Sequence, residues 1–434
     1  MASINTKQKI YTHGGVVARH ITLTQQLMRT VMSCMLWENT FYEDGKTIAE
    51  RIKELCASLV STPAVIADIA LKAKNDMRLR HVPLLLVREL FRCKENRDLA
   101  GRTLYEIISR PDDITEFLAI YWKDNRDEPL AKQAKLALGR AFHKFSAYQL
   151  AKYNGGSKAI KLVDALRIVH PTKSDLLGKL RRNELETPVT WEVELSKGGD
   201  KKETWTRLIN GSKLGGLAFL RNIRNMREAN IDMDLIRSGI EKIDSGRLLP
   251  INFIASAKHN PHFEPEIEKK FFECFGKEKV GGNTVLLIDV SGSMSDRLSG
   301  KSELTRADVA SALAMIARET FDDMQLFSFS DTIVKLPARR GFAIKNMLDQ
   351  QSHQCTYLGS AVRTIIAEVP HDRLIVITDE QSHDSVPDFK GYLINVASNK
   401  NGVGYGQCVH IDGWSDKVID YIVQSEKSKL SDEV

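Results

Sequence analysis

The spacing of apolar residues divides the chain into two parts that differ in their period. Through the first 270 or so residues, apolar positions recur every three or four residues, as on one face of an amphipathic helix. Segments with this pattern cover residues 22–37, 47–60, 64–77, 81–93, 113–125, 130–153, 158–170 and 215–226. Prolines lie near several of their ends, where helices begin or stop. This succession of short helices, with no strand pattern between them, predicts an α-solenoid of HEAT-like repeats.

After residue 280 the period changes to short, nearly continuous apolar runs of strand length. These runs cover residues 283–290, 324–331, 373–380 and 391–398, and helical patterns lie between them at 305–319 and 358–369. Continuously apolar strands that alternate with helices are typical of a doubly wound parallel sheet covered on both faces. Because 434 residues are too many for one ordinary core, we predict a helical domain at 1–277 and an α/β domain at 278–434.

Charge is distributed unevenly between these two parts, within a net charge of +6. Residues 1–280 hold 47 Lys and Arg against 35 Asp and Glu, whereas the remainder holds 15 against 21. The resulting charges of +12 and −6 suggest a polyanionic partner for the first part alone, although many basic domains bind nothing anionic.

The rest of the composition indicates a cytoplasmic protein. The first residues, MASINTKQKI, are polar and lack the apolar core of a signal peptide. No apolar run approaches the roughly 18 residues that a membrane helix needs. The six cysteines, at positions 34, 56, 93, 274, 355 and 408, form no CxxC pair. Their wide spacing argues against a zinc site or a disulfide framework and fits a reducing compartment.

Oxygen-bearing side chains follow two of the predicted strands. Asp289, Ser291 and Ser293 stand at alternate positions after one strand, and Asp379 follows another. Thr356 precedes a predicted helix, and all five residues fall where the carboxyl ends of parallel strands gather. A hard divalent cation prefers such oxygen ligands, so we predict a site for Mg2+, or alternatively Mn2+. In the competing interpretation the two serines only cap a helix and Asp289 closes a turn.

A hydrolase triad can also be drawn from Ser291, Asp379 and either His353 or His383. The nucleophile elbow G-x-S-x-G is absent, however, because Val290 precedes the serine where a small residue is favoured. We therefore predict a protein without catalytic activity.

Two helical segments concentrate basic residues. The first carries Lys152, Tyr153, Lys158, Lys161, Arg167, His170 and Lys173, and the second carries Arg221, Asn222 and Arg224. Rows of guanidinium and ammonium groups suit phosphate oxygens, and asparagine amides can add hydrogen bonds. The segments therefore suit a phosphate-bearing partner, which the resemblance described below implies to be RNA, with solvated helix faces as the alternative.

The metal motif resembles the metal-ion-dependent adhesion site of von Willebrand factor A domains. The resemblance implies that the hydroxyls of Ser291, Ser293 and Thr356 bind Mg2+ directly and that Asp289 and Asp379 act through water. It also implies an open position that a partner's carboxylate often fills. The loop before the threonine commonly begins with Gly-Gly in that family, whereas Gln354 and Cys355 stand there in this chain.

The chain contains, in order, a helical array with LRIVHPTK, a helix with AFLRNIRNM and an A-like domain. This order resembles that of the Ro autoantigen family, the TROVE-domain RNA-binding proteins. The resemblance covers nearly the whole chain and implies a ring of helical repeats bridged by the A-like domain. It further implies that small noncoding Y RNA binds the outer surface and that single-stranded 3′ ends of misfolded RNA enter a central hole. His170 matches a position implicated in Y RNA binding in that family, Lys152 and Tyr153 match a nearby basic pair, and the spacing makes Lys158 less secure.

From these features we predict a monomeric, non-catalytic protein component of a Ro-type ribonucleoprotein. It would hold a Y-like RNA and serve RNA quality control by presenting RNA ends, with an exoribonuclease as a potential partner. The alternative is a metal-dependent protein adaptor whose A-like domain captures a partner's carboxylate. Salt-dependent RNA binding separates the two hypotheses, because an adaptor should show little of it.

Overall fold

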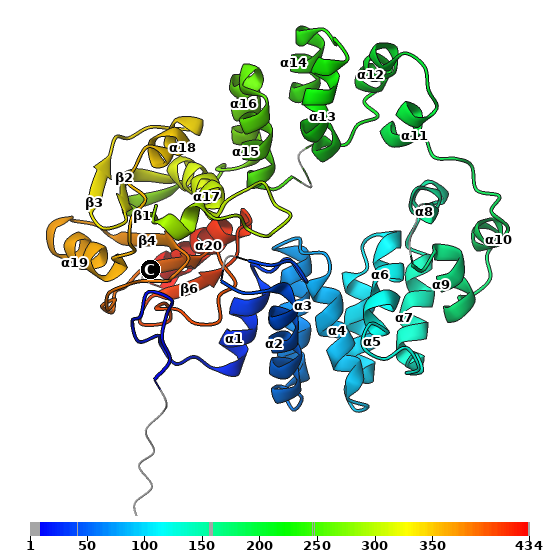
Figure 1. The fold of residues 1–434 in the computed structure, drawn as a ribbon, viewed down its shortest axis with the longest axis horizontal. Coiled ribbons are helices and arrows are strands. Elements are labelled where there is room, and N and C mark those ends of the chain that lie inside the picture. The colour runs from blue at the N-terminus through cyan, green and yellow to red at the C-terminus, as the bar shows by residue number, and fades with distance from the viewer. Residues whose placement is uncertain (1–8, 41, 156–158, 245, 247, 433–434) are drawn as a thin grey trace, which may run out of the picture. The chain divides into compact units, whose positions relative to one another are not determined.

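The computed structural model describes residues 9–40, 42–155, 159–244, 246 and 248–432, which form two compact units (Figure 1). Cys34–Trp37 and Gly45–Leu214 make up the first, which we name the helical unit. Met1–Ser33, Glu38–Asp44 and Gly215–Val434 make up the second, which we name the sheet unit. The predicted boundary between residues 277 and 278 marks the change from helices to strands, whereas the compact units separate elsewhere.

The helical unit consists of short helices that pack on their neighbours in sequence. They are α2 (Gly45–Ser58), α3 (Pro63–Asn75), α4 (Val82–Arg92), α5 (Arg97–Ile107), α6 (Pro111–Tyr121), α7 (Lys132–Phe142), α8 (Ala147–Asn154), α9 (Leu162–Val169), α10 (Asp175–Arg182), α11 (Trp191–Ser196) and α12 (Lys201–Asn210). Pro63 and Pro111 occupy first turns, where a missing backbone N–H costs nothing. Phe91, Phe117 and Tyr121 form an aromatic cluster where α4 packs on α6. The predicted array of short helices is confirmed.

The predicted helical segment 130–153 is divided in the structure into α7 and α8. Ser146 begins α8, because its side-chain oxygen accepts a hydrogen bond from the N–H of Gln149 at 3.3 Å. Phe145, directly before the cap, is buried. Its burial keeps the apolar spacing nearly continuous, and for that reason the break does not show in the apolar period.

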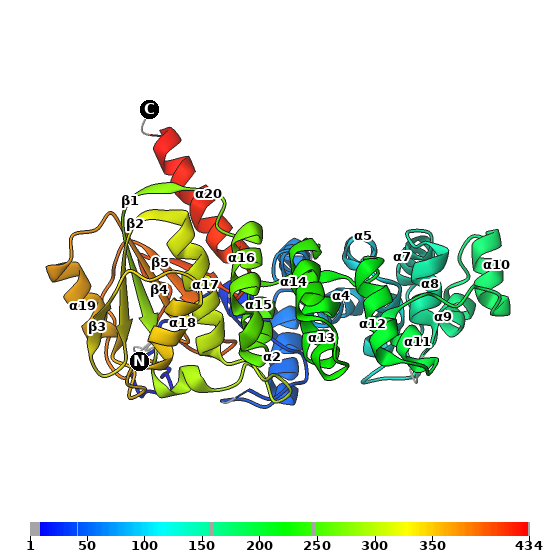
Figure 2. The ribbon, with the colours of Figure 1, turned by 90° about the horizontal axis from the view of Figure 1, so that it is seen from above.

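The sheet unit contains further helices before its strands begin. They are α1 (Leu23–Val31), α13 (Gly216–Glu228), α14 (Met233–Lys242), α15 (Pro250–His259), the 3₁₀ turn η1 (Pro261–Phe263) and α16 (Glu264–Cys274). α15 packs on α13, on α16 and on α17 of the sheet layer, as Figure 2 shows from above. Among the described residues, none of the helices is long and apolar enough to cross a membrane.

Six strands form one sheet in the order β3-β2-β1-β4-β5-β6. The strands are β1 (Val280–Asp289), β2 (Phe321–Phe329), β3 (Ile333–Leu336), β4 (Arg373–Thr378), β5 (Tyr392–Asn395) and β6 (Val409–Asp412). The helices and turn between and after them are η2 (Gly292–Ser295), α17 (Arg306–Thr320), α18 (Phe342–Asp349), α19 (Leu358–Glu368) and α20 (Lys417–Asp432). The chain runs outward from β1 in both directions, so the sheet's switch point lies between β1 and β4. The predicted doubly wound A-like sheet is confirmed.

One edge of the sheet differs from the all-parallel prediction. β3 pairs with β2 in antiparallel register, with Phe329 opposite Ile333. Only three residues separate the two strands, and a parallel pair needs a crossover of a dozen or more. The short connection therefore forces an antiparallel edge strand.

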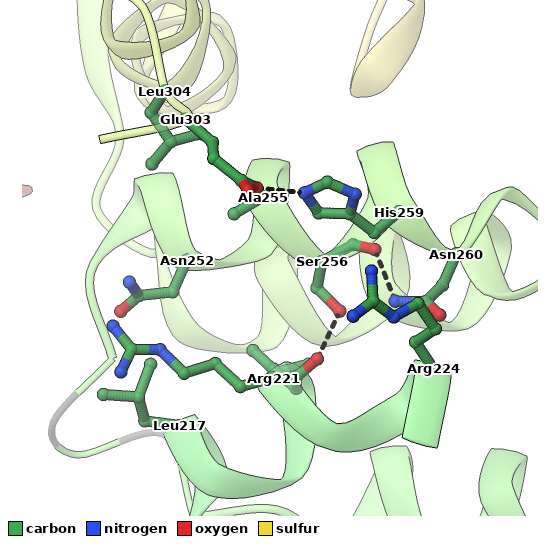
Figure 3. A pocket seen from close by; sticks show the side chains of 11 residues that line it. Leu217, Arg221, Arg224, Asn252, Ala255, Ser256, His259, Asn260, Glu303 and Leu304 are labelled. Atoms are coloured by element: carbon green, nitrogen blue, oxygen red, sulfur yellow. Dashed lines mark hydrogen bonds and ion pairs between the residues drawn. The ribbon is translucent and has the colours of Figure 1, made fainter. Parts of the chain in front are cut away.

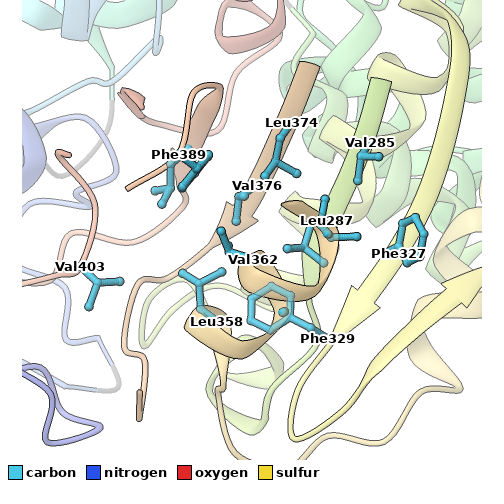
Figure 4. Packing of buried hydrophobic residues seen from close by; sticks show 13 residues of the cluster. Val285, Leu287, Phe327, Phe329, Leu358, Val362, Leu374, Val376, Phe389 and Val403 are labelled. Carbon is cyan, nitrogen blue, oxygen red and sulfur yellow. The ribbon is translucent and has the colours of Figure 1, made fainter. Parts of the chain in front are cut away.

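The apolar core of the sheet unit explains why its strands are continuously hydrophobic. Val285, Leu287, Leu374 and Val376 from the central strands pack with α19 residues such as Val362 on one face (Figure 4). The alternate β1 residues, Leu286 and Ile288, are equally inaccessible to solvent. Both faces of β1 are thus buried over Val285–Ile288, which accounts for its continuous apolar run.

A buried ionic network attaches α1 to the sheet. The guanidinium of Arg29 lies 2.9 Å from Glu380 and donates a hydrogen bond to the carbonyl of Asn399 at 2.7 Å. His410 contacts both Glu380 and Asp412, and its Nδ1 lies 3.4 Å from the latter. Burial would lower the pKa of His410, but the carboxylates of Asp412 and Glu380 outweigh that effect and raise the pKa to about 9.

We expect this network to make stability depend on pH above neutrality. Because the folded-state pKa of His410 lies above 6.5, its stabilisation is complete below pH 6.5 and is lost as the pH rises through 9. The free energy of unfolding, measured with urea, should fall by on the order of 3 kcal/mol between pH 6 and pH 10. His410→Gln should make this fall much smaller. The control is His262→Gln, at an exposed position. Equal pH profiles for wild type and His410→Gln would contradict the assignment.

Candidate metal centre and nucleic-acid surfaces

Two carboxylates end adjacent strands at the switch point of the sheet. Asp289 is the last residue of β1, Asp379 follows β4, and neither is exposed to solvent. Asp289 Oδ1 accepts a hydrogen bond from the N–H of Ser291 at 2.9 Å, and Oδ2 accepts one from Thr378 Oγ1 at 2.6 Å. The hydroxyl oxygens of Ser291 and Ser293 lie 3.4 Å apart. Four of the predicted ligands therefore come from loops that directly follow β1 and β4.

The loop that carries Thr356 is bonded to both of these loops. The backbone N–H of Thr356 donates to His383 Nδ1 at 3.1 Å, and its carbonyl accepts from the N–H of His383 at 2.7 Å. The N–H of Gly292 donates to the carbonyl of Gln354 at 3.0 Å. The replacement of the usual Gly-Gly by Gln354 and Cys355 thus leaves the threonine loop joined to the serine loop.

Arg306 is a residue of this centre that sequence reasoning missed. It is the first residue of α17 and is 2 % exposed. Its Nη1 donates to Asp379 Oδ2 at 2.8 Å and to the carbonyl of Ser293 at 3.3 Å. No local motif marks it, because the contact joins residues 73 positions apart.

The charges of the centre leave room for a cation. Two fully buried carboxylates face one buried guanidinium, so among the described residues one carboxylate has no cationic partner. Burial, followed by the charge of Asp379, raises the pKa of Asp289 to about 7. Carboxylates and hydroxyls are the donors that Mg2+ and Mn2+ prefer, and the residues therefore fit a divalent cation.

The histidines of the alternative hydrolase triad are engaged elsewhere. His353 Nδ1 lies 2.5 Å from the carbonyl of Val290, and its Nε2 lies 3.3 Å from the carbonyl of Asp349. His383 Nδ1 accepts the N–H of Thr356. Neither imidazole is hydrogen-bonded to Ser291, and the geometry lends the triad no support.

A basic groove lies between α9 and α10 in the helical unit. It has a volume of about 800 Å³, and Arg167, His170 and Lys173, all exposed, line it as part of the predicted set. Lys179, Arg181 and Arg182 of α10 add three cations that sequence reasoning missed. Their spacing within GKLRRN is the signal that could have identified them.

Lys152, Tyr153 and Lys161 of the first predicted segment are not among the residues that line this groove. α8, which carries Lys152 and Tyr153, packs on both α9 and α10. The guanidinium carbon of Arg110 lies 5.0 Å from the centre of the Tyr153 ring, in a cation–π contact. Lys161 is exposed at the N-cap of α9, and Lys158 lies outside the described residues.

A smaller pocket of about 380 Å³ lies between α13 and α15 in the sheet unit (Figure 3). Arg221 and Arg224 line it from α13, with exposed guanidinium groups. Asn252 and His259 line it from α15, and His259 Nε2 lies 2.9 Å from the carboxylate of Glu303. Figure 3 shows side chains of both helices turned toward the space between them. The pocket combines two strong cations with amide and imidazole hydrogen-bonding groups.

Asn222 does not belong to this pocket, and the expectation that it contacts RNA is corrected. Its side chain is 4 % exposed, and its Nδ2 donates to the carbonyl of Ala218 at 2.8 Å. Its Oδ1 accepts a hydrogen bond from Asn225 at 2.8 Å. The helix turns Asn222 toward the buried side on which Phe219 and Met226 lie.

Comparison with known proteins places both basic surfaces in a recognised segment. Residues 162–264 match the family model described as the TROVE domain. Telomerase protein component 1 is 30% identical over 117 residues in Mus musculus and 31% identical over 117 residues in Rattus norvegicus. The matched segment is 26% of this chain and spans only 4% of each relative.

The fold has a counterpart among solved structures. The crystal structure of the Ro (RSR) protein of Deinococcus radiodurans matches with a TM-score of 0.60 and 15% identity. The match covers 93% of this chain and 100% of that chain, so the likeness of fold includes both the helices and the sheet. The predicted resemblance to the TROVE-domain family is confirmed.

We expect Asp289→Asn to remove divalent-cation binding while the fold persists. A cation that binds only the native state stabilises it, by about 2.7 kcal/mol at 100 times the dissociation constant. Mg2+ should therefore raise the thermal midpoint of wild type relative to EDTA and leave Asp289→Asn unchanged. Asp322→Asn, at an exposed carboxylate, should respond as wild type does. Equal Mg2+-induced shifts in wild type and Asp289→Asn would refute the site.

Proposed function

We propose that this chain belongs to the Ro family of TROVE-domain proteins, is an RNA-binding component of a ribonucleoprotein and has no catalytic activity of its own. In this proposal the groove between α9 and α10 binds a small noncoding, Y-like RNA. The pocket between α13 and α15 binds the single-stranded 3′ end of a misfolded RNA. The protein would act in cytoplasmic RNA quality control by presenting such ends to an exoribonuclease.

The observation that carries the proposal is the concentration of cations in the α9–α10 groove, inside the segment that matches the TROVE domain. Five Lys and Arg side chains and His170 line it, with Asp175 as the one acidic residue among its lining residues. Rows of cations neutralise phosphates and release counterions, and this effect dominates affinity for nucleic acids. A basic groove of about 800 Å³ suits a folded RNA, which proteins recognise by shape, phosphates and sugar hydroxyls.

The α13–α15 pocket suits a single strand better than a folded RNA. Its volume of about 380 Å³ is less than half that of the groove. Arg221 and Arg224 provide two phosphate contacts, while Leu217 and Leu304 offer apolar surface for a base. Single-strand binding sites combine these two elements, a charged path and surfaces on which bases lie.

The divalent cation belongs to the proposal as a structural group. Ser291, Ser293 and Thr356 would bind it directly, while Asp289 and Asp379 would hold its water ligands. The cation would supply the positive charge that two buried carboxylates and one arginine leave unbalanced. The geometry at the ends of β1 and β4 supports this role, and it requires no reaction at the metal.

The second candidate is a metal-dependent adaptor that captures a partner's carboxylate. The complete set of five oxygen-donor residues favours it, since A-like domains of that kind use the same set. It predicts RNA binding that is weak and nearly independent of salt, whereas the proposed function predicts a steep dependence.

We expect His170→Ala with Lys173→Ala to weaken binding of a hairpin RNA on the order of tenfold and to lower its salt slope. The same pair should leave a short single strand nearly unaffected. Filter-binding titrations at several salt concentrations measure both quantities. Lys277→Ala with Lys390→Ala removes two exposed charges elsewhere and should change neither ligand. If the variant with His170→Ala and Lys173→Ala binds the hairpin RNA with wild-type affinity, the α9–α10 groove is not its binding site.

We expect Arg221→Ala with Arg224→Ala to have the opposite selectivity. Each lost phosphate contact should lower the slope of log K against log salt by about 0.7 for a single strand. Two contacts therefore reduce the slope by about 1.4, with little effect on the hairpin. Parallel losses of both RNAs in both double variants would show one continuous basic surface in place of two sites.

A further inference from the structure

A short segment near the N-terminus contacts the candidate metal centre. Residues 38–40 and 42–44, which we name the strap, belong to the sheet unit. The carboxylate of Glu38 accepts a hydrogen bond from Ser299 Oγ, and the carbonyl of Asn39 accepts one from the N–H of Gly300 at 2.8 Å. The strap is thereby fixed on the loop that follows the metal-binding serines.

Tyr42 of the strap lies on the centre itself. Its side chain is hydrogen-bonded to Ser293, one of the predicted direct ligands. Arg306, which pairs with Asp379, has its guanidinium carbon 5.2 Å from the centre of the tyrosine ring. The ring of His13 stacks on the tyrosine ring, with 4.0 Å between centroids and planes 20° apart.

His13 is held by the loop that follows Asp379. The backbone N–H of His13 donates to Gln381 Oε1 at 3.0 Å, and Thr12 Oγ1 donates to the carbonyl of Ser382 at 2.9 Å. A Cβ on Gly14 would come within 2.2 Å of that same carbonyl oxygen, so only glycine permits this approach. The stacked rings are therefore attached to two loops of the centre. The strap binds Tyr42 to the serine loop, and residues 12–14 bind His13 to the loop that follows Asp379.

We infer that Tyr42 and His13 cover the candidate metal centre and occupy the side from which a partner's carboxylate would approach the cation in other A-like domains. This inference rests on the proposed cation site and goes beyond it in assigning the open position to the chain itself. The phenol hydroxyl orients Ser293, and the two stacked rings exclude bulk water and anionic side chains. The cation then helps to hold two N-terminal segments on the sheet and is not accessible to a partner's carboxylate.

A centre covered by Tyr42 and His13 favours the RNA-binding function over the adaptor function. A partner carboxylate could reach the cation only after the strap leaves Ser293, Ser299 and Gly300. The cost of that opening makes adaptor capture unfavourable in the intact chain. RNA binding at the helices requires no such opening.

The test uses Mn2+ as the probe with full-length wild type, Tyr42→Phe, Tyr42→Ala and the control Tyr11→Phe. Amide hydrogen exchange of the strap should slow about tenfold when Mn2+ binds wild type, and it should not change in Tyr42→Ala. Acetate, as a small carboxylate, should leave the Mn2+ affinity of wild type unchanged and increase that of Tyr42→Ala. Tyr42→Phe, which keeps the ring but loses the bond to Ser293, should stay insensitive to acetate and bind Mn2+ more weakly. Tyr11, whose ring is 52% exposed, should behave as wild type when changed to Phe.

Each outcome decides a separate point. If wild type binds Mn2+ but strap exchange is unaffected, or if acetate strengthens Mn2+ binding to wild type, the cover is wrong while the metal site stands. If wild type binds no Mn2+, both the metal site and the cover are wrong. RNA titrations on the same preparations are independent of either result. A Tyr42→Ala chain whose Mn2+ binding responds to acetate, with an unresponsive wild type, establishes the cover.

Discussion

Repulsion between the carboxylates of Asp289 and Asp379 is the constraint around which the sheet unit is arranged. Both lie at the switch point of the sheet, where β1 and β4 end side by side, and neither has access to water. Such charges must be neutralised or paired within the protein. Arg306 pairs with Asp379, while burial and, after it, the charge of Asp379 raise the pKa of Asp289. The serine and threonine loops and the ring stack of Tyr42 on His13 all surround these two carboxylates.

The two basic surfaces differ in the physical means by which they can select RNA. The α9–α10 groove offers five Lys and Arg side chains beside His170, and this density of cations favours ligands with closely spaced phosphates. The α13–α15 pocket has fewer cations, flanked by leucines and hydrogen-bonding groups. A flexible strand can place a base there, whereas the bases of a helical stem are already stacked and paired.

Sequence patterns predicted those features that depend on neighbours in the chain. Four of the six strands, many of the helices and the Asp-x-Ser-x-Ser loop could be inferred because their residues lie within a few positions of one another, whereas β3 and β6 were missed. Arg306 and Tyr42 could not, because their contacts depend on how α17 and the strap pack. Asn222 was misassigned although its spacing from Phe219 and Met226 places it on the buried face of α13. The edge strand β3 was missed because only a short connection separates it from β2. The break before α8 was missed because the buried Phe145 continues the apolar spacing.

The passage of the chain between its two compact units has a practical consequence for dissecting the protein. Neither unit is one continuous stretch, since Cys34–Trp37 precedes the strap and Gly45 resumes the helical unit after it. A fragment that starts at residue 278 would contain every strand but lack Arg29, leaving the fully buried carboxylate of Glu380 without its arginine. Removing one partner of such a pair typically costs 3–5 kcal/mol. Domain swaps and truncations designed from the strand boundary would therefore produce a weakened sheet, and a soluble A-like domain requires the N-terminal residues to be supplied with it.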